Sequence, residues 1–526
     1  MKRRLPIGIQ DFVGIREDGF LYVDKTERIH ELVTSSGKTF FLSRPRRFGK
    51  SLLCSTLGSL FEGRRELFQG IAGQPALAID SLEWDWRKRP VIRIDLNAGN
   101  YAGGVNELRA NLRRSVELCA RKYDVPYSGD TCSDNFARLI ESLSNKYNEK
   151  VAVIIDEYDK PLLSTIDTIK LHQEMRDELK GFYGVLKSSD EYLQFVFLTG
   201  VTKFAQVSVF SDLNHITDLT LDSAYCDICG FTQEELEQNF AEEITEIVKN
   251  RGDTQETYLA QLKQFYNGYR FSKKPLTVYN PFGLLNHFRS DGEFLSYWYG
   301  TGTPAFLIKL IENQKIDILN LEKESVMLPD FQRFDVENME AVPVLYQSGY
   351  LTIVDYDDAF HEYFLDYPNE EVRTSFSQSL MEHYLHVPGS DLRALLRTLP
   401  RALVQGDVDG AVNAMKTFLA EVPYDIQIED EKYYQTVFHL IFRILGLSCR
   451  SEVRLAAGRI DSLIETKNQV YCFEFKLNKT AEEALAQIDS KDYLLPWNGS
   501  GKKLFKIGVN FVYKDRNIGE WKVEER

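Results

Sequence analysis

The chain has 526 residues and an ordinary globular composition, with 43% hydrophobic and 27% charged residues, and its length predicts about three domains. Its net charge of −15 argues against broad, tight, nonspecific nucleic-acid binding, although a local basic site stays compatible with it. No apolar run approaches the roughly 20 residues that cross a bilayer, so we expect no membrane partner. The seven cysteines are scattered and odd in number, which predicts a reducing compartment, the cytoplasm.

A basic loop between a short apolar run and an apolar helix pattern carries the first site motif. The run Phe40–Leu42 has the composition of a buried strand, and Gly49-Lys50-Ser51 opens the helix pattern. In a P-loop, backbone N–H groups and the helix N-terminus bind phosphates, the lysine reaches the outer phosphates and the serine hydroxyl binds Mg²⁺. The first glycine of the usual pattern is replaced by Arg44, so a basic helix start on a solvated face is the alternative. The residues that we expect to contact the nucleotide are Arg44, Arg46, Arg47, Phe48, Gly49, Lys50, Ser51 and Leu52.

Two acids follow the next apolar run, Val151–Ile155, which predicts a strand covered on both faces. Asp156, at the tip of this strand, is placed to hold Mg²⁺ opposite Ser51. Glu157, the next residue, is a candidate for polarising the attacking water. The sequence therefore predicts a magnesium site between the helix start and the acidic strand end.

A third apolar run, Leu193–Leu198, ends at Thr199, whose hydroxyl is a candidate sensor of the terminal phosphate. A further strand is predicted at 90–96, and helices are predicted at 104–124 and 133–147. Strands that alternate with helices and end in phosphate-binding chemistry predict a parallel sheet with flanking helices. We therefore assign residues 1–230 to an α/β domain of the P-loop NTPase class.

The middle region, 231–370, is predicted to be a helical lid that ends in a winged-helix-like segment. The pattern at 341–367 predicts a helix followed by a hairpin, a shape that either binds DNA or only packs. Arg270 is a candidate sensor arginine for the nucleotide. Just before this region, Cys226 and Cys229 form the one close cysteine pair, and we interpret them as buried thiols because no second pair or histidine stands at zinc-ligand spacing.

The last region, 371–526, begins with helices predicted at 373–386, 391–404, 407–421 and 432–446. Two strands follow, separated by a turn at 467–468, and we expect them to pair as a hairpin. The second strand carries Glu474 and Lys476 two residues apart, so their side chains share one face. Pairing of the strands would bring Asp461 to the same end of the hairpin.

Asp461, Glu474 and Lys476 are the residue types of a metal-dependent hydrolytic site. The two carboxylates would hold one or two Mg²⁺ ions, and Lys476 would orient or deprotonate the attacking water and offset phosphate charge. Gln487, on the helix predicted after the second strand, would supply a further polar contact. The alternative is a surface hairpin that carries a Glu–Lys ion pair.

These motifs resemble those of the bacterial AAA-ATPase-like family, whose members join an atypical P-loop domain to a C-terminal PD-(D/E)XK nuclease domain. The resemblance covers nearly the whole chain and is carried by residues 5–8, 22–26, 43–51, 155–159, 199–202, 266–269, 346–350, 368–372, 458–461 and 474–476. It implies that Lys50 and Ser51 bind ATP, and that Arg44 in place of glycine is usual for the family.

The resemblance also implies an α/β, restriction-endonuclease-like core in which Asp461, Glu474 and Lys476 form the metal site. Such cores often carry one more acid on the preceding helix. Glu452 is the candidate for that acid, and a salt bridge is its alternative role.

Two functions of different classes are compatible with these motifs. In the first, ATP binding and hydrolysis gate a Mg²⁺-dependent nuclease that acts on DNA or RNA. In the second, ATP binds tightly, hydrolysis is slow, and the nuclease-like domain binds without cutting, so that the chain acts as a switch toward a partner. A third reading, a structural interaction protein, would bind no nucleotide. The sequence leaves open whether a homo-oligomer or a partner protein supplies an arginine to the ATP site.

Overall fold

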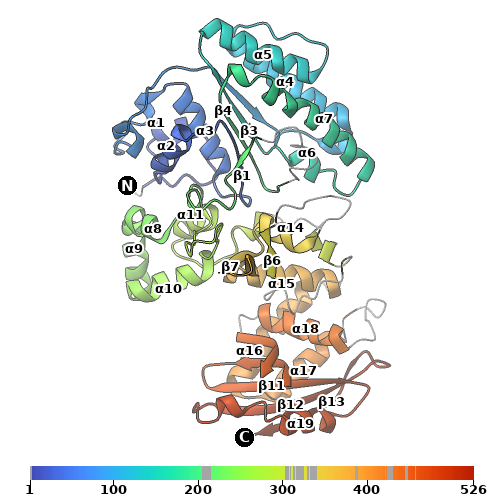
Figure 1. Ribbon diagram of the computed structural model, residues 1–526. Helices are drawn as coiled ribbons and strands as arrows, with labels where there is room; N and C mark the ends of the chain where they lie inside the picture. The colour runs from blue at the N-terminus through green and yellow to red at the C-terminus, as the bar shows by residue number, and fades with distance from the viewer. Residues whose placement is uncertain are drawn as a thin grey trace. The chain divides into compact units, whose positions relative to one another are not determined.

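The computed structural model describes residues 3–203, 215–301, 307–308, 310–311, 314, 325–328, 331, 340–385, 389–420, 422, 431–444, 448–455 and 458–526. The chain forms two compact units (Figure 1). One unit consists of Met1–Gly300 and Lys323–Asn369, and the other of Thr301–Glu322 and Glu370–Arg526. The three predicted domain ranges stay predictions, but the boundary expected after residue 370 lies one residue from a junction of the two units.

Within the described residues, no helix is both long and apolar enough to cross a membrane.

The first unit contains a five-stranded sheet in the order β2-β3-β4-β1-β5, and its pairs are parallel. The strands are β1 (Thr39–Ser43), β2 (Val91–Asp95), β3 (Val151–Asp156), β4 (Leu193–Gly200) and β5 (Thr217–Asp218). β1 and β3 are buried along their whole length, as their continuous apolar runs predict for strands covered on both faces. β4 lies between them, so the P-loop strand and the acidic strand are separated by one strand.

Helices cover both faces of this sheet, with α1, α2 and α3 on one face and α4, α5 and α7 on the other (Figure 1). Their bounds are α1 (Phe12–Glu17), α2 (Thr26–Thr34), α3 (Lys50–Phe61), α4 (Val105–Tyr123), α5 (Cys132–Tyr147), α6 (Lys160–Leu163) and α7 (Ile169–Ser188). The predicted α/β architecture of a parallel sheet with flanking helices is therefore confirmed.

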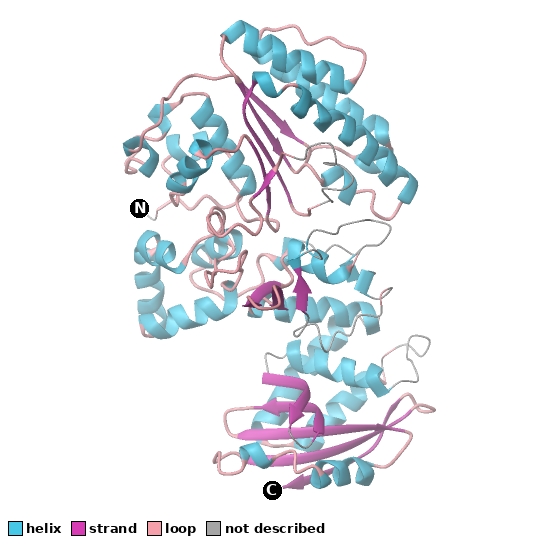
Figure 2. Cartoon of the chain, viewed as in Figure 1, coloured by secondary structure: helices cyan, strands magenta, loops and turns pink. Residues whose placement is uncertain are grey.

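The rest of the first unit is helical and ends in a small antiparallel sheet (Figure 2). The apolar faces of its first four helices share one core; these are α8 (Gln233–Asn239), α9 (Ala241–Arg251), α10 (Gln255–Tyr266) and α11 (Pro281–Arg289). The last part comprises α14 (Ala341–Ser348), β6 (Ser325–Met327), β7 (Thr352–Asp357) and β8 (Glu362–Asp366). The predicted helix and hairpin are confirmed, but seven of the eight residues of α14 are buried, so this helix is not exposed to enter a DNA groove.

From Glu370 onward, the second unit has four helices, as predicted, and then a mixed sheet in the order β13-β12-β11-β10-β9. Its helices are α15 (Glu370–Leu385), α16 (Gly389–Gln405), α17 (Val408–Leu419), α18 (Glu431–Ile444) and α19 (Ala481–Ser490). Its strands are β9 (Ser448–Leu455), β10 (Gly458–Glu465), β11 (Gln469–Leu477), β12 (Lys503–Val512) and β13 (Asn517–Glu525). β11 and β12 are parallel, and the other pairs are antiparallel.

The alternation of side chains along β11 determines which helix covers which face of this sheet. Phe473 and Phe475 pack against Phe442 and Phe438 of α18, with ring centroids 5.7 and 4.9 Å apart. Cys472 points to the opposite face and belongs to the core cluster that contains residues of α19. The acids and the lysine of the predicted site therefore lie on the α19 face, away from the aromatic core.

Candidate nucleotide and metal sites

The first candidate site is the loop between β1 and α3. Gly49 is the N-cap residue of α3 and has a φ of 92°, a left-handed conformation that glycine adopts without strain. The helix therefore begins at Lys50, and the N–H groups of its first turn have no partner within the helix. This is the local geometry that binds phosphate at a helix N-terminus.

The side chain of Lys50 is folded back over the loop. Its Nζ donates to the carbonyl oxygens of Arg44 at 3.1 Å and Pro45 at 3.2 Å, and it lies 3.6 Å from Oε1 of Glu157. The side chain is only 3% exposed. The ammonium is thus surrounded by the loop that would hold the phosphates, and by the acid that would polarise the attacking water.

Ser51 and Asp156 meet beside this lysine, as the sequence predicts. The hydroxyl of Ser51 lies close enough to the carboxylate of Asp156 to lower its pKa. Burial raises the pKa of Asp156 to about 6, although the Ser51 hydroxyl opposes that shift. A buried carboxylate beside a hydroxyl is a set of hard oxygen donors, which fits Mg²⁺.

Glu157 has a strained backbone. Its φ is 52°, which is uncommon for a residue other than glycine, and its N–H donates to Oδ1 of Asp156 at 3.0 Å. Such strain is frequent at active sites, where the surrounding structure holds the residue in place.

The sequence analysis assigned no role to Asp159, which follows these acids in the turn between β3 and α6. One of its carboxylate oxygens accepts from the N–H groups of Val201 and Thr202 and from the Thr202 hydroxyl. The other oxygen, Oδ1, is buried and has no hydrogen-bond partner among the described residues. Burial raises the pKa of Asp159 to about 6. The signal in the sequence was the third acid of Asp156-Glu157-Tyr158-Asp159, at the same strand end.

The predicted sensor Thr199 is fully buried on β4, and its hydroxyl donates to the carbonyl of Leu42 at 2.7 Å. Its assignment as a phosphate sensor stays a prediction. The contact shows that the hydroxyl joins β4 to β1.

Arg44 occupies the position of the missing glycine, and its guanidinium is buried in the fold. It donates to the carbonyls of Ser43, Thr220 and Tyr225, and its Cζ lies 4.2 Å from the ring centroid of Phe271. A phosphate contact by this side chain would require it to leave these carbonyls. The carbonyl of Arg44, in contrast, already binds Lys50.

Arg46 and Arg47 are both exposed, and neither forms an ion pair with another described residue. The Cζ of Arg47 lies 4.7 Å from the ring centroid of Phe282. Phe48, in contrast, is buried against Tyr269 and Phe271, with ring centroids 4.8 and 5.4 Å away. Ser51 and Leu52 are half-buried at the start of α3. The two arginines are therefore the cations of this loop that are available to a phosphate.

The helical region of the first unit holds the P-loop from outside the sheet. The indole N–H of Trp298 donates to the carbonyl of Arg46 at 3.0 Å. Gly349, at the end of α14, is so close to Pro45 that a Cβ on it would lie 2.7 Å from the proline ring. Arg270, the candidate sensor arginine, instead donates to the carbonyls of Ser272, Lys273, Lys274 and Val354.

The second candidate site lies on the β10–β11 hairpin, whose pairing the sequence predicts. Oδ2 of Asp461 accepts from the N–H of Phe475 at 2.9 Å, and Nζ of Lys476 lies 3.1 Å from Oε1 of Glu474. Both acids are buried, with 9% and 1% exposure. Burial and the charges of Glu474 and Asp461 raise the pKa of the Cys472 thiol, which indicates that the two carboxylates share one environment. The three predicted residues are thus brought together.

Of two other predicted members of this site, Gln487 has no described bond to the acids, whereas Glu452 lies opposite Asp461, between the paired residues Ile460–Val453 and Ser462–Ser451. Gln487 is half-buried on α19, and no described hydrogen bond links its side chain to the acids, so its role stays a prediction. Glu452 was expected on a helix, but it lies on strand β9, because the chain between α18 and Asp461 forms an edge strand. Its side chain is outside what the structure describes.

The carboxylates of Asp461 and Glu474 are hard oxygen ligands, which fit Mg²⁺. In the described part of the chain, no three histidine, cysteine or acidic side chains are grouped to hold a metal ion. Water and phosphate oxygens would be further ligands of a metal on this hairpin. Cys226 and Cys229 are both buried, free cysteines, as the sequence analysis interprets them.

Comparison with known proteins places both sites within known families. The model of the AAA-ATPase-like family, described as predicted AAA-ATPases, matches residues 6–210, and that of the PD-(D/E)XK nuclease superfamily matches residues 429–521. The chain is 35% identical over 540 residues to an "Uncharacterized protein in vnfD 5'region" of Azotobacter chroococcum mcd 1, covering 99% of each chain. No solved structure gives a significant match. The chain therefore belongs to the AAA-ATPase-like family and carries a PD-(D/E)XK nuclease superfamily domain at its C-terminus.

Proposed function

We propose that this chain is a cytoplasmic ATPase whose nucleotide state controls a Mg²⁺-dependent nuclease that acts on DNA or RNA. The observation that carries the proposal is the meeting of Lys50, Ser51, Asp156 and Glu157 at an unblocked helix N-terminus. This set supplies a phosphate-binding cation, two metal ligands and a base, which are the parts that phosphoryl transfer needs.

ATP binding would begin with a change of partner for Lys50. Its ammonium is held by two carbonyls and one carboxylate, and phosphate oxygens would replace them as stronger, charged acceptors. Arg46 and Arg47 would add charge to the same loop. Mg²⁺, held by Ser51 and Asp156, would neutralise charge on the phosphates. Glu157, released by Lys50, would accept a proton from the attacking water.

The second site supports hydrolysis of a phosphodiester. Asp461 and Glu474 would hold Mg²⁺, which lowers the pKa of a bound water. Lys476 touches Glu474 and also donates to the carbonyl of Phe475 at 3.0 Å, so its position is determined by the strand that carries the metal ligands. Its ammonium would offset the charge of the scissile phosphate and orient the water.

The nucleic acid is not expected to bind through the winged-helix-like segment. α14 is buried, and the end of β7 and the turn after it carry the acids Asp355, Asp357 and Asp358, which repel phosphates. The proposal therefore places nucleic acid at the nuclease-like domain alone.

The decisive experiment measures ATP binding, phosphate release and cleavage of plasmid, single-stranded DNA and RNA with Mg²⁺ or Mn²⁺. Lys50→Ala should abolish ATP binding, whereas Asp461→Asn and Lys476→Ala should abolish cleavage and leave ATP affinity unchanged. Lys491→Ala, which alters an exposed lysine beyond α19, is the matched control and should cleave normally. Unchanged ATP affinity in Lys50→Ala would refute the nucleotide site, and cleavage by Asp461→Asn would refute the nuclease site.

A second function, an ATP-dependent switch without cleavage, is favoured by a different observation. Trp298, Tyr269 and Gly349 all contact the loop at Pro45–Phe48, so a nucleotide on this loop would be sensed by the helical region. A switch would bind ATP tightly, hydrolyse it slowly and cut no substrate. Multiple turnovers per minute or any Lys476-dependent cleavage would exclude it.

A further inference from the structure

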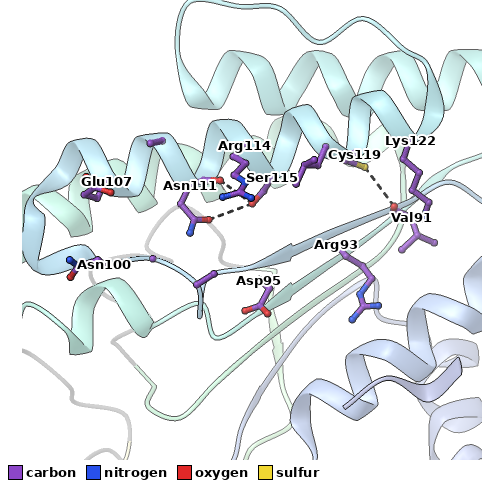
Figure 3. A pocket seen from close by; sticks show the side chains of 14 residues that line it. Val91, Arg93, Asp95, Asn100, Glu107, Asn111, Arg114, Ser115, Cys119 and Lys122 are labelled. Atoms are coloured by element: carbon purple, nitrogen blue, oxygen red, sulfur yellow. Dashed lines mark hydrogen bonds between the residues drawn. The ribbon is translucent and has the colours of Figure 1, made fainter. Parts of the chain in front are cut away.

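A groove follows the open edge of the first sheet, between β2 and α4 (Figure 3). β2 is the last strand of the sheet at this edge. The groove has a volume of about 720 Å³, and its lining extends on α4 from Glu107 to Lys122. Fifteen helical steps correspond to a length of about 22 Å, which matches about six or seven residues of extended chain.

The backbone of β2 offers hydrogen-bonding groups to this groove. The carbonyl of Pro90 accepts from the N–H of Ala152, and the N–H of Leu96 donates to the carbonyl of Asp156. Because alternate residues of a strand face opposite neighbours, the even-numbered residues face β3 and the odd-numbered ones face outward. The outward groups of Arg93 and Asp95 have no partner among the described residues.

The edge is closed at one end only. The N–H of Val91 donates to the hydroxyl of Tyr123 at 3.0 Å, and its carbonyl accepts from that hydroxyl at 3.3 Å and from the thiol of Cys119. α4 therefore covers the first outward position and leaves the next two open. Natural proteins usually protect such an edge, and an exposed edge beside a groove is the arrangement to which extended peptides add as a strand.

Basic and acidic side chains lie toward opposite ends of the groove. Arg93 and Arg114 form no ion pair with a described residue; Arg114 lies on α4, whereas Arg93 extends from β2 away from α4 (Figure 3) and packs against Gly58 of α3. Asp95 and Glu107 lie toward the other end. Lys122 is neutralised by Glu62, 2.6 Å away. Two acids balance the two arginines that have no ion-pair partner among the described residues. The groove therefore complements a segment that carries both acidic and basic side chains. A polyanion would be repelled at the acidic end.

We propose that this groove binds an extended segment of a partner protein, which adds to β2 as a strand. The segment carries an acidic and a basic side chain two residues apart, because residues at this spacing share one face of a strand. Its acid meets Arg93 and its basic group meets Asp95, which share the face of β2 away from α4, while Arg114 and Glu107 of α4 present the same two charges on the other face. The exposed side chain of Leu118, 55% accessible and one turn beyond Arg114 on α4, supplies an apolar contact.

The test uses the fluorescein-labelled peptide Thr-Val-Glu-Val-Lys-Val-Thr and the full-length protein, and measures fluorescence anisotropy. A second peptide has N-methyl groups on alternate amides, which removes the N–H groups that would pair with β2. Arg93→Glu should weaken binding by about tenfold or more, whereas Arg113→Glu, at an exposed residue of α4 outside the groove, should leave it unchanged. Arg93→Pro should weaken binding more than Arg93→Ala, since proline removes the outward N–H without disturbing the bonds to β3.

We expect saturable binding of the first peptide and loss of about tenfold or more with the methylated one. No saturable binding by the wild type up to about 1 mM, or equal binding of both peptides, overturns the proposal. Arg93-dependent binding of a single-stranded DNA of about 20 nucleotides, without peptide binding, assigns the groove to nucleic acid instead. A dimer that Arg93→Glu dissociates in sedimentation assigns it to a second copy of this chain.

Discussion

Nζ of Lys50 lies 3.6 Å from Oε1 of Glu157, so the lysine of the P-loop and the acid that follows β3 form an ion pair. Lys50 is also bound by two carbonyls of its own loop, and Glu157 has a φ of 52°, a conformation that costs about 1–3 kcal/mol. The ion pair alone therefore does not fix the position of either residue. The pair therefore links the phosphate-binding loop to the strand end where hydrolysis is proposed to occur.

Glu157→Gln separates binding from hydrolysis. The amide keeps the shape of the side chain but cannot pair with Lys50 by charge or accept a proton, so ATP affinity should stay the same or rise while phosphate release falls about 10²-fold or more. Fluorescent ATP binding and single-turnover phosphate release measure the two effects. Glu191→Gln, a change at an exposed acid, is the control and should behave as wild type. Hydrolysis within about threefold of wild type would remove Glu157 from the proposed role.

Gly200→Ala tests the packing around Asp159. A Cβ at this position would lie 2.7 Å from Cδ1 of Tyr158 and even closer to Oδ1 of Asp159. The acid must then move from its three hydrogen bonds, and we expect a loss of about 1–3 kcal/mol in the free energy of unfolding. Urea unfolding measures it. Gly184→Ala is the matched control, because a Cβ there meets nothing within 4 Å on helix α7, and it should stabilise by about 0.5–1 kcal/mol.

The apolar runs in the sequence predict the strands of the first sheet, because each run reflects the burial of its own residues. Val151–Ile155 is apolar at every position, and a strand buried on both faces requires that composition. β5, in contrast, has only the two residues Thr217–Asp218, and no pattern of that length distinguishes a strand from a loop. Its place beside β1 depends on tertiary pairing.

The residues of the candidate sites also differ in whether the sequence predicts their position. Asp461, Glu474 and Lys476 were predictable, because the period of a strand and one hairpin fix which side chains meet. The orientation of Arg44 was not, because its guanidinium is bound by the carbonyls of Thr220 and Tyr225, more than 170 positions away in the chain. Sequence spacing carries no information about such a contact, so a basic loop residue and a buried structural arginine look alike.

Trp298→Phe tests whether the helical region senses the nucleotide. The indole N–H bonds the carbonyl of Arg46 inside the P-loop, so ATP binding should alter tryptophan fluorescence through this residue. The variant should lose that fluorescence change, and its ATP affinity should change by a factor of about 2–10, the value of one hydrogen bond. Trp521→Phe is the control, because its indole bonds Asp409 in the second unit. An ATP-induced signal that persists in Trp298→Phe would contradict the link.

His287 gives the helical region a pH-dependent stability. The side chain is fully buried; Nε2 lies 2.7 Å from the hydroxyl of Tyr258, and Nδ1 lies 3.0 Å from the carbonyl of Glu293. Burial lowers its pKa to about 4, and Arg251 acts in the same direction. The unfolded chain, with a pKa of about 6.5, binds more protons between these values, so the contribution of His287 to stability falls as pH falls from about 6.5 to about 4.

His287→Gln isolates this effect, because glutamine offers one donor and one acceptor but does not titrate in this range. The urea midpoint of the wild type should fall more steeply than that of the variant between pH 6.5 and pH 4, by a difference that corresponds to at most about 3 kcal/mol. Asp156 and Asp159, whose raised pKa values act in the opposite direction over the same range, are present in both proteins and cancel in the comparison. His383→Gln, a change at a half-buried histidine of the second unit, is the control. Parallel pH profiles for wild type and His287→Gln would show that the native state tolerates a charged His287.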